Sequence, residues 1–319
     1  MALRVIFMGT PAFAVPALKI LHEQKHELVL VVTQPDRPRG RGQALAASPV
    51  KQAALALRLD VVQPLKIREP RFVEHLRALS PDVIIVAAFG QLLSEEILKI
   101  PPYGCINLHA SLLPKYRGAA PIHWSVLNGE KETGNTVMLM DKGMDTGAIL
   151  MSNRIAIGDD ETTGEVHDRL AVSGALLLAE ALEKLKKREL TPTAQDDERA
   201  NYAPKLTGDL EIIDWRVSSA AVFNKIRGLY PWPVAYTFTE HGRLKIHAAR
   251  LYKKDARRQP PGRFAGLTGD GFLVAAADGV LEILKVQPES KKIMPALDFA
   301  KGYIAGKGEG LYFGRKSDV

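Results

Sequence analysis

LRVIFMGTPAFAVPALKILHEQKHELVLVVT, residues 3–33, decides the fold of the first half of the chain. Its two ends, Leu3–Met8 and Leu28–Thr33, are short apolar runs of the kind that form buried strands. Between them, Ala12–Gln24 repeats apolar residues at helical spacing. A strand, a helix and a second strand in so short a span form a βαβ unit with parallel strands, so the stretch predicts an open α/β sheet.

The same alternation continues toward the middle of the chain. Asp82–Ala88 and Gly104–His109 are further apolar runs, while Ser48–Leu57 and Pro70–Leu79 show helical spacing. Ser48 precedes a proline at the first helical position, which is a clear helix start. We therefore expect a Rossmann-like open sheet with helices on both faces, and a ligand crevice beyond the carboxyl ends of its strands.

The last third of the chain has a different pattern. Short β-like runs separated by turn signals are Val234–Thr239, Leu244–Leu251, Gly271–Ala276 and Leu281–Val286. They predict a small β-barrel, for which the OB fold is a candidate. A polar stretch without periodicity precedes them, so the predicted division is a Rossmann-like domain over 1–189, a linker over 190–206 and an OB-like domain over 207–319.

Composition describes an ordinary globular protein. Of 319 residues, 46% are hydrophobic and 25% charged, and Cys105 is the only cysteine. A single thiol in an apolar run indicates core packing and excludes intrachain disulfides and multi-cysteine zinc sites. The sequence shows neither a leader-peptide pattern nor an apolar run long enough to span a membrane, so we expect a cytoplasmic location without membrane association.

Positive charge gathers in the last third of the chain. The net charge is +7, and residues 207–319 hold 18 Lys+Arg against 12 Asp+Glu, while residues 1–206 hold 25 against 24. This asymmetry suggests a polyanionic partner for the C-terminal region, although a solvated basic face explains the charge equally well.

Two familiar patterns carry other functions elsewhere but not here. His22–His26 matches the H-E-x-x-H metalloprotease motif, yet it falls at the end of a predicted helix without an obvious third ligand. Met8–Pro11 follows the first strand with one glycine, and Pro11 removes a backbone donor from the place where a dinucleotide would bind. We expect no metal and no nicotinamide or flavin.

Asn107 and His109 interrupt the apolar run Gly104–His109 near its carboxyl end. Two residues apart on a strand, their side chains point to the same face. An amide and an imidazole side by side supply the donors that a developing oxyanion needs, and the imidazole can also move a proton. Asp145, in a glycine-flanked turn after Thr136–Met140, could orient the imidazole. From the pattern alone, a capping Asn107, a packed His109 and an ordinary turn at Asp145 are an equally good interpretation.

His109–Gly118, HASLLPKYRG, preceded by Asn107, resembles the signature of the folate-dependent formyltransferases. Further motifs keep the family's order over most of the chain and favour its branch that acts on methionyl-tRNA. They are FMGTPAF (7–13), QPDRPRGRG (34–42), SPVK (48–51), DKGMDTG (141–147), NYAPKL (201–206), IDW (213–215) and IRGLYPWP (226–233). The family's fold, a Rossmann-like domain followed by an OB-like barrel, agrees with the division above.

The resemblance implies a reaction and its residues. The α-amine of methionine esterified to initiator tRNA would attack the formyl carbon of 10-formyltetrahydrofolate, with Asn107 and His109 stabilising the oxyanion and Asp145 orienting His109. The implied folate wall is Ser111, Leu112, Leu113 and Pro114. The implied tRNA contacts are Arg37, Arg39 and Arg41 in the loop Gln34–Gly42, and Lys253, Lys254, Arg257 and Arg258 in the barrel.

No metal is implied, and the expected form is a monomer. The alternative is a folate-dependent formyltransferase acting on a small amine, which would share the central site without needing the arginine loop or the basic barrel. A non-catalytic RNA-binding protein on the same scaffold is a further alternative, and the complete set of Asn107, His109 and Asp145 argues against it.

Overall fold

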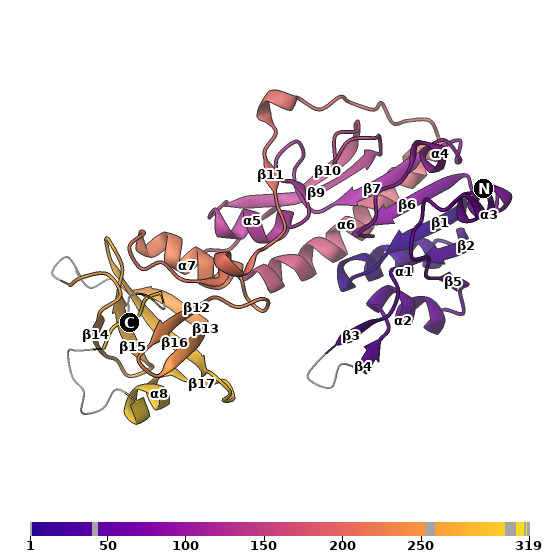
Figure 1. Cartoon of the computed structure of the whole chain (residues 1–319). Coiled ribbons are helices and arrows are strands. Elements are labelled where there is room, and N and C mark those ends of the chain that lie inside the picture. The colour runs from indigo at the N-terminus through magenta and orange to yellow at the C-terminus, as the bar shows by residue number, and fades with distance from the viewer. Residues whose placement is uncertain (1, 40–43, 253–258, 304–310, 316, 318–319) are drawn as a thin grey trace. The chain divides into compact units, whose positions relative to one another are not determined.

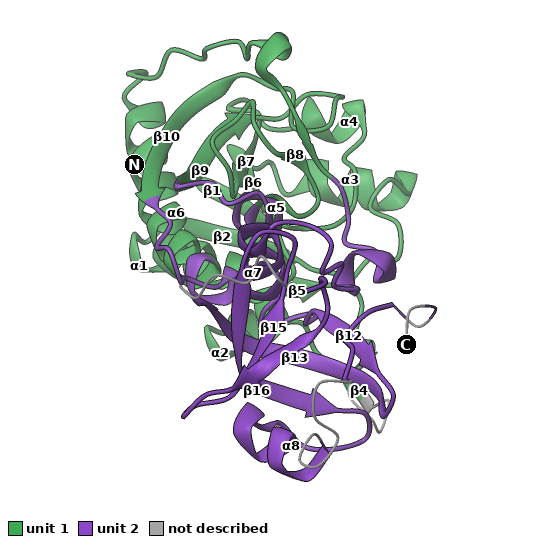
Figure 2. Ribbon diagram, turned by 90° about the vertical axis from the view of Figure 1, so that its left-hand side faces the viewer, with its two compact units in different colours: residues 1–121, 132–155, 167–203 green, residues 122–131, 156–166, 204–319 purple. Residues whose placement is uncertain are grey.

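The structure is a computed structural model of the whole chain, and it describes residues 2–39, 44–252, 259–303, 311–315 and 317 (Figure 1). Its contacts form two compact units. Unit 1 comprises residues 1–121, 132–155 and 167–203, and unit 2 comprises residues 122–131, 156–166 and 204–319 (Figure 2). None of the helices among the described residues is both long and apolar enough to cross a membrane.

Unit 1 is built on a seven-stranded sheet with the order β10-β9-β7-β6-β1-β2-β5. Its strands are β1 (Arg4–Gly9), β2 (Glu27–Val32), β5 (Val61–Val62), β6 (Val83–Ala87), β7 (Cys105–His109), β9 (Glu132–Leu139) and β10 (Ile149–Ala156). The pairs from β5 through β7 are parallel, and β9 runs antiparallel to β7. The predicted Rossmann-like α/β sheet is confirmed.

The helices of unit 1 follow the predicted alternation. They are α1 (Val15–Glu23), after the 3-10 turn Ala12–Ala14, then α2 (Pro49–Ala56), α3 (Pro70–Ala78), α4 (Glu95–Leu98) and most of α6 (Thr163–Lys186). As predicted, Ser48 caps α2, because its hydroxyl accepts from the Lys51 N–H at 3.0 Å. Helix α1 ends before His26, whose Nδ1 accepts from the Leu3 N–H at 3.2 Å, so His22 and His26 do not share a helix face.

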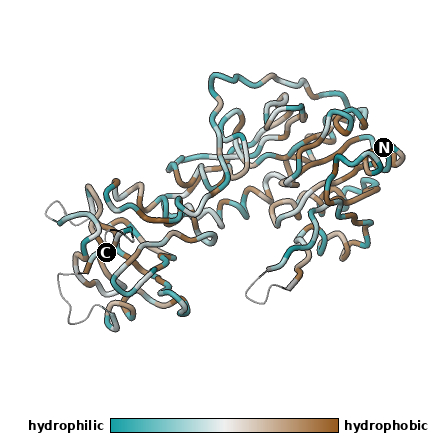
Figure 3. The backbone as a smooth tube through the Cα atoms, viewed as in Figure 1, coloured by the Kyte–Doolittle hydropathy of each residue, from teal (hydrophilic) through white to brown (hydrophobic). Residues whose placement is uncertain are grey.

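A hydrophobic cluster fills one side of this sheet because the central strands are apolar along their whole length. Its members include Ile6, Met8, Ile84 and Phe89, which are all at most 2% exposed. Figure 3 colours these strands largely brown and the polar segment that follows α6 largely teal. That segment contains the 3-10 turn Asp197–Arg199, and its strand β11 (Tyr202–Ala203) pairs in parallel with β8 (Arg117–Gly118).

Unit 2 contains a curled antiparallel sheet with the order β12-β13-β16-β15-β14, with β17 also paired to β16. Its strands are β12 (Tyr236–Thr239), β13 (Gly242–Tyr252), β14 (Phe264–Leu267), β15 (Phe272–Ala275), β16 (Val280–Pro288) and β17 (Met294–Pro295). Register shifts around Ala248 mark irregularities in the long strand β13, where a bulge bends and twists a sheet. The predicted OB-like barrel is confirmed as this curled half-barrel.

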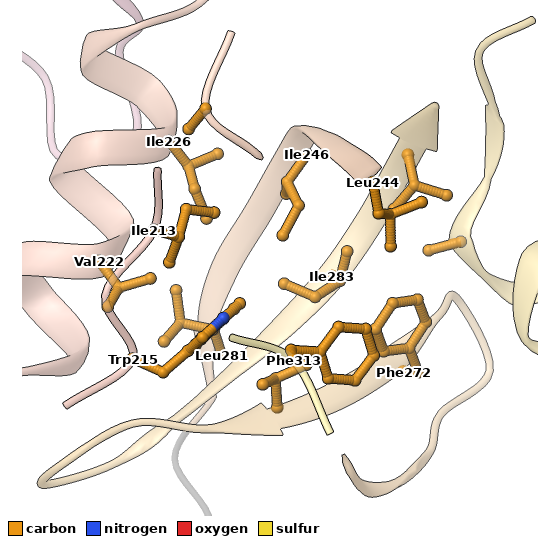
Figure 4. Close-up of a cluster of buried hydrophobic side chains, with 14 of the residues drawn as sticks. Ile213, Trp215, Val222, Ile226, Leu244, Ile246, Phe272, Leu281, Ile283 and Phe313 are labelled. Atoms are coloured by element: carbon orange, nitrogen blue, oxygen red, sulfur yellow. The ribbon is translucent and has the colours of Figure 1, made fainter. Parts of the chain in front are cut away.

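Helix α7 (Ser219–Gly228) and helix α8 (Ala296–Tyr303) accompany the sheet of unit 2, together with most of α5 (Pro121–Leu127) and the 3-10 turn Gly208–Glu211. Figure 4 shows the core between α7 and the strands, where Phe272 and Phe313 lie face to face. Their ring centroids are 5.4 Å apart with planes 12° apart. Trp215 closes the cluster, and its buried indole N–H donates to the Thr237 hydroxyl at 3.1 Å.

We expect Phe272→Ala to lower the free energy of unfolding of unit 2 by about 3–5 kcal/mol, because it removes a fully buried ring and leaves a cavity. Leu267→Ala on the neighbouring strand β14 is the control, since Leu267 is 55% exposed and little burial is lost. Urea titration followed by tryptophan fluorescence measures both. Equal, small effects of the two substitutions would contradict the packing described here.

Candidate active site

The predicted donor pair lies at the carboxyl end of β7, in the middle of the sheet of unit 1. Asn107 and His109 are only 8% and 6% exposed, since β7 has strands on both sides. The neighbouring strand β9 pairs antiparallel with β7 and places Met138 and Thr136 opposite them. Two polar groups are thus held among apolar surroundings at the sheet edge where α/β proteins bind ligands.

His109 has an oxygen near each ring nitrogen. Its Nε2 is 2.9 Å from the carbonyl oxygen of Tyr116, and its Nδ1 is 3.7 Å from Oδ2 of Asp145. A carbonyl can only accept, so Nε2 carries the proton in the neutral ring. A second proton, at Nδ1, would face the carboxylate. The site can therefore accept a proton on the imidazole and balance the resulting charge.

Asp145 joins the donor pair to the signature loop. Its Oδ1 accepts from Nδ2 of Asn107 at 3.4 Å, and its Oδ2 accepts from the Gly118 N–H at 2.8 Å. The carboxylate is 17% exposed and thus contacts Asn107, Gly118 and His109. The three residues predicted from the sequence therefore lie together. Asp145 has a φ of +56°, in the left-handed region where a short polar side chain is tolerated better than most.

The amide of Asn107 keeps donor capacity for a substrate. Nδ2 carries two hydrogens, so it can donate to Asp145 and to one further acceptor at the same time. An uncharged donor fixed by a carboxylate is already oriented before an oxyanion forms, which is the condition for electrostatic stabilisation of a transition state. The arrangement suits attack of a nucleophile on a carbonyl carbon followed by proton transfer.

The loop that carries Tyr116 is held by the polar segment before β11. The Tyr116 N–H donates to the side-chain oxygen of Asn201, and the Arg117 N–H donates to the Asn201 carbonyl at 3.0 Å. Tyr116 has a φ of +61°, a costly conformation for a bulky residue that persists only where the surroundings impose it. The contacts of Asn201 impose it here and so direct the Tyr116 carbonyl at His109.

Gln195 fixes the Asp145 turn and was not predicted from the sequence. Its Nε2 donates to the carbonyls of Asp145 and Gly147, each at 2.8 Å. Its Oε1 accepts from Nε and Nη2 of Arg117 at 3.1 and 2.9 Å. Arg117 is 2% exposed and also forms an ion pair with Asp197 at 2.6 Å. Nothing local marks Gln195 as functional, because it lies in a segment without periodicity.

We expect Gln195→Ala to lower kcat by roughly ten-fold, because the Asp145 turn loses two hydrogen bonds and the catalytic geometry loosens. The melting temperature should fall only modestly, since Gln195 is partly buried and Arg117 keeps its ion pair with Asp197. Gln195→Glu keeps the Arg117 contact but offers no hydrogens to the two carbonyls, so it should be as impaired as alanine. A Gln195→Glu variant with native kcat would show that those two bonds are unimportant.

The proposed folate wall follows β7 directly. Ser111 and Leu113 are buried, and their backbone is pinned by Thr136, whose hydroxyl donates to the Ser111 carbonyl at 2.7 Å and accepts from the Leu113 N–H at 3.1 Å. Leu112 and Pro114 are partly exposed, so they are the members able to touch a ligand directly. Ser111 instead donates its hydroxyl to the Lys115 carbonyl at 2.6 Å.

The arginine loop is only partly described. Arg37 is exposed on β3 (Arg37–Arg39), which pairs with β4 (Ala44–Ala46), and Arg41 lies outside the described residues. For Arg39, the last residue of β3, the structure describes the backbone alone. The one acid of the loop, Asp36, accepts from Lys51 and Gln63, each at 2.7 Å, and these hydrogen bonds lower the pKa of its carboxyl.

The four predicted basic residues of unit 2 all lie outside the described residues, namely Lys253, Lys254, Arg257 and Arg258. Among the neighbouring basic residues that the structure describes, Arg250 is held by carboxylates of unit 2 itself. Its Nε forms an ion pair with the buried Glu282 at 2.6 Å, and its Nη2 with Asp270 at 2.9 Å. Arg243 lies over the ring of Tyr236, 5.4 Å from its centroid.

Cys105 is packed in the core, and the part of the chain that the structure describes contains no cluster of potential metal ligands. Burial raises the pKa of the Cys105 thiol to about 12, and its sulfur contacts the Ile97 carbonyl, so this residue is a packing element as predicted. Among the described residues, no three His, Cys, Asp or Glu side chains gather closely enough to hold a metal ion.

Comparison with known proteins follows the two parts of the chain. Residues 3–182 match the family model described as formyl transferase, and residues 205–304 match the one described as formyl transferase, C-terminal domain. The methionyl-tRNA formyltransferase of Moorella thermoacetica is 49% identical over 307 residues, covering 96% of this chain and 98% of that protein. The corresponding protein of Clostridium novyi is 46% identical over 301 residues, covering 94% and 97%.

Solved structures share the fold at low identity. HypX from Aquifex aeolicus in complex with tetrahydrofolic acid is 17% identical with a TM-score of 0.65, covering 96% of this chain and 48% of that one. An N-formyltransferase from Helicobacter canadensis, in complex with folinic acid and dTDP-3-aminofucose, is 18% identical with a TM-score of 0.67, covering 89% and 100%.

Proposed function

The chain belongs to the formyl transferase family, and we propose that it is an enzyme that transfers the formyl group of 10-formyltetrahydrofolate to the α-amino group of methionyl initiator tRNA, for translation initiation. The observation that carries the proposal is the carboxylate of Asp145, which contacts both Asn107 and His109. Relatives named methionyl-tRNA formyltransferase, 46% to 49% identical over nearly the whole chain, support this choice of substrate.

The reaction can be followed atom by atom. The amine nitrogen of the methionyl ester attacks the formyl carbon, and the carbonyl oxygen becomes an oxyanion that Asn107 Nδ2 stabilises with its remaining hydrogen. The amine then loses a proton, and the bond between the formyl carbon and the folate nitrogen breaks. The departing folate nitrogen takes up a proton. His109, with a carboxylate beside Nδ1, can hold that proton between the two events.

The oxyanion role of His109 requires a change in its contacts. Nε2 donates to the Tyr116 carbonyl in this structure, so the imidazole can donate to the substrate only if it turns away or uses Nδ1 after protonation. We therefore assign the fixed oxyanion donor to Asn107. His109 serves as the proton carrier and charge balance, and Asp145 orients both.

The tRNA substrate accounts for the parts of the chain beyond this site. We propose that Arg37, Arg39 and Arg41 contact the acceptor end and that Lys253, Lys254, Arg257 and Arg258 contact phosphates, giving a salt-dependent affinity. We propose that the chain functions as a Rossmann-like catalytic domain over residues 1–189, a linker over 190–206 and an OB-like tRNA-binding domain over 207–319. Monomeric action in the cytoplasm belongs to the same proposal.

A small-amine formyltransferase is the alternative, since sugar N-formyltransferases share the fold. It is less favoured, because those proteins are only 18% and 19% identical to this chain. The deciding experiment incubates the protein with 10-formyltetrahydrofolate and either methionine-charged initiator tRNA or a free amine such as glycinamide ribonucleotide. Formylation of the tRNA alone is expected. Formylation of the free amine alone would overturn the proposal.

A further inference from the structure

Unit 2 contains a cavity of about 360 Å³ that the proposed reaction does not use. It lies between the end of α7, the strands β13 and β16, and the segment 156–166, which all belong to unit 2 (Figure 2). Its volume is at the lower end of the range of sites that bind a small molecule or a single nucleotide. The question is what chemistry its walls select.

Arg227 gives the cavity a buried positive charge whose hydrogen bonds all go to neutral acceptors, while the carboxylates of Asp159, Asp160 and Glu161 lie near enough to favour its charged form without a direct ion pair. The residue is 6% exposed, and its Nη1 donates to the carbonyls of Gly158 and Glu161 at 3.2 and 2.8 Å. Its Nε donates to Oδ1 of Asn224 at 2.8 Å. Every one of these acceptors is neutral, and Nη2 has no hydrogen-bond partner among the described residues. A buried cation in this state favours an anionic ligand.

The remaining lining divides into a charged rim and a flat apolar side. Lys285, exposed on β16, is a second cation at the same opening, and Asp160 contributes one carboxylate. Tyr230 and Ile293 supply apolar surface, and the Tyr230 ring meets the His247 ring edge to face at 6.0 Å. Burial lowers the pKa of His247, so its ring is neutral at pH 7 and adds no charge.

We infer that this cavity binds one nucleotide, with its phosphate between Arg227 and Lys285 and its base against Tyr230. A guanidinium and an ammonium together suit a phosphate, an aromatic ring suits any base, and Asp160 can accept from a ribose hydroxyl. A purely apolar ligand would leave Nη2 of Arg227 without an acceptor. The nucleotide can be a residue of the RNA substrate or a free mononucleotide, and only the first source rests on the proposed function.

The test uses the full-length protein with Lys285→Gln, because Lys285 is exposed and its loss should leave folding intact. Lys301→Gln on α8 is the control, since it removes the same charge from an exposed position that does not line the cavity. Binding of initiator tRNA is measured over a range of salt concentrations. Binding of AMP and of inorganic phosphate is measured by titration calorimetry.

If RNA is the source, Lys285→Gln should raise the Kd for tRNA roughly five-fold and lower the slope of log K against log salt by about one, while Lys301→Gln keeps the native slope. If a free nucleotide is the source, Lys285→Gln should lower the affinities for AMP and for inorganic phosphate, and the affinity for tRNA should stay native. In that case Tyr230→Leu should weaken AMP binding and spare phosphate, because it removes the stacking ring alone.

The inference is overturned if Lys285→Gln binds both tRNA and AMP with native affinity. It is also overturned if Lys301→Gln lowers these affinities as much as Lys285→Gln does. Formyl transfer at saturating tRNA distinguishes this failure from failure of the proposed function. Lys285→Gln should retain the native kcat whatever the source of the nucleotide, whereas a native protein without any formyl transfer contradicts the function itself.

Discussion

Replacing Asn107 with alanine is expected to lower kcat for formyl transfer by a factor on the order of 10²–10³. Within the trio, the amide of Asn107 is the donor that is both uncharged and already oriented, because Asp145 accepts from it at 3.4 Å. Since the donor acts on the oxyanion more than on the neutral formyl group, KM for both substrates should change much less than kcat.

The same strand provides a matched control for Asn107→Ala. Cys105 is on the same face of β7 two residues earlier, is 1% exposed, and packs in the hydrophobic cluster with its sulfur against the Ile97 carbonyl. Cys105→Ala also shortens a buried side chain, yet it should leave kcat within about two-fold because the thiol is remote from the reacting atoms. A folded Asn107→Ala protein with near-native kcat would remove Asn107 from the mechanism.

The periodic elements could be predicted because burial alone determines them. Leu3–Met8, Leu28–Thr33 and Asp82–Ala88 correspond to β1, β2 and β6 within a residue or two, since strands covered on both faces are apolar throughout. The bounds of strand β9 could be predicted only in part. It begins at Glu132, but only its end was predicted from the apolar run Thr136–Met140.

The first part of β9 could not be predicted because it contains buried polar residues. Thr133 and Asn135 are at most 3% exposed, and the Asn135 amide donates to the Ser173 hydroxyl at 3.0 Å and to the Leu170 carbonyl at 3.2 Å. These partners of the Asn135 amide nitrogen are 35 and 38 residues away in the sequence, so no local pattern reveals that the side chain is buried. The same limit applies to Gln195, whose contacts with Asp145 and Arg117 span about fifty to eighty residues.

The candidate trio shows which features of a site a sequence motif can predict. The spacing of Asn107 and His109 on one strand predicts a shared face, and the resemblance supplies Asp145 from a distant turn. It does not predict that Nε2 of His109 donates to Tyr116, because that bond depends on the left-handed backbone of one residue in the loop. The chemical roles of the three side chains therefore depend on their geometry as well as on the residue types.

Asp145→Asn should be the more damaging of the two substitutions, with kcat lowered by about 10³–10⁴, as is typical when the carboxylate that orients a catalytic histidine becomes an amide. Oδ1 accepts from Asn107 and Oδ2 accepts from the Gly118 N–H, so either orientation of the new amide places an NH₂ group against a donor. His109 also loses the negative charge that balances a protonated ring.

The left-handed backbone at this position, with a φ of +56°, allows charge to be separated from folding. Asparagine tolerates this conformation well and glycine pays no steric cost for it, whereas alanine is strained there. Asp145→Asn and Asp145→Gly should therefore melt close to the native temperature and be equally inactive, while Asp145→Ala should melt lower. Native kcat in either folded variant would mean that the carboxylate charge does not support formyl transfer, and that His109 needs no anionic partner.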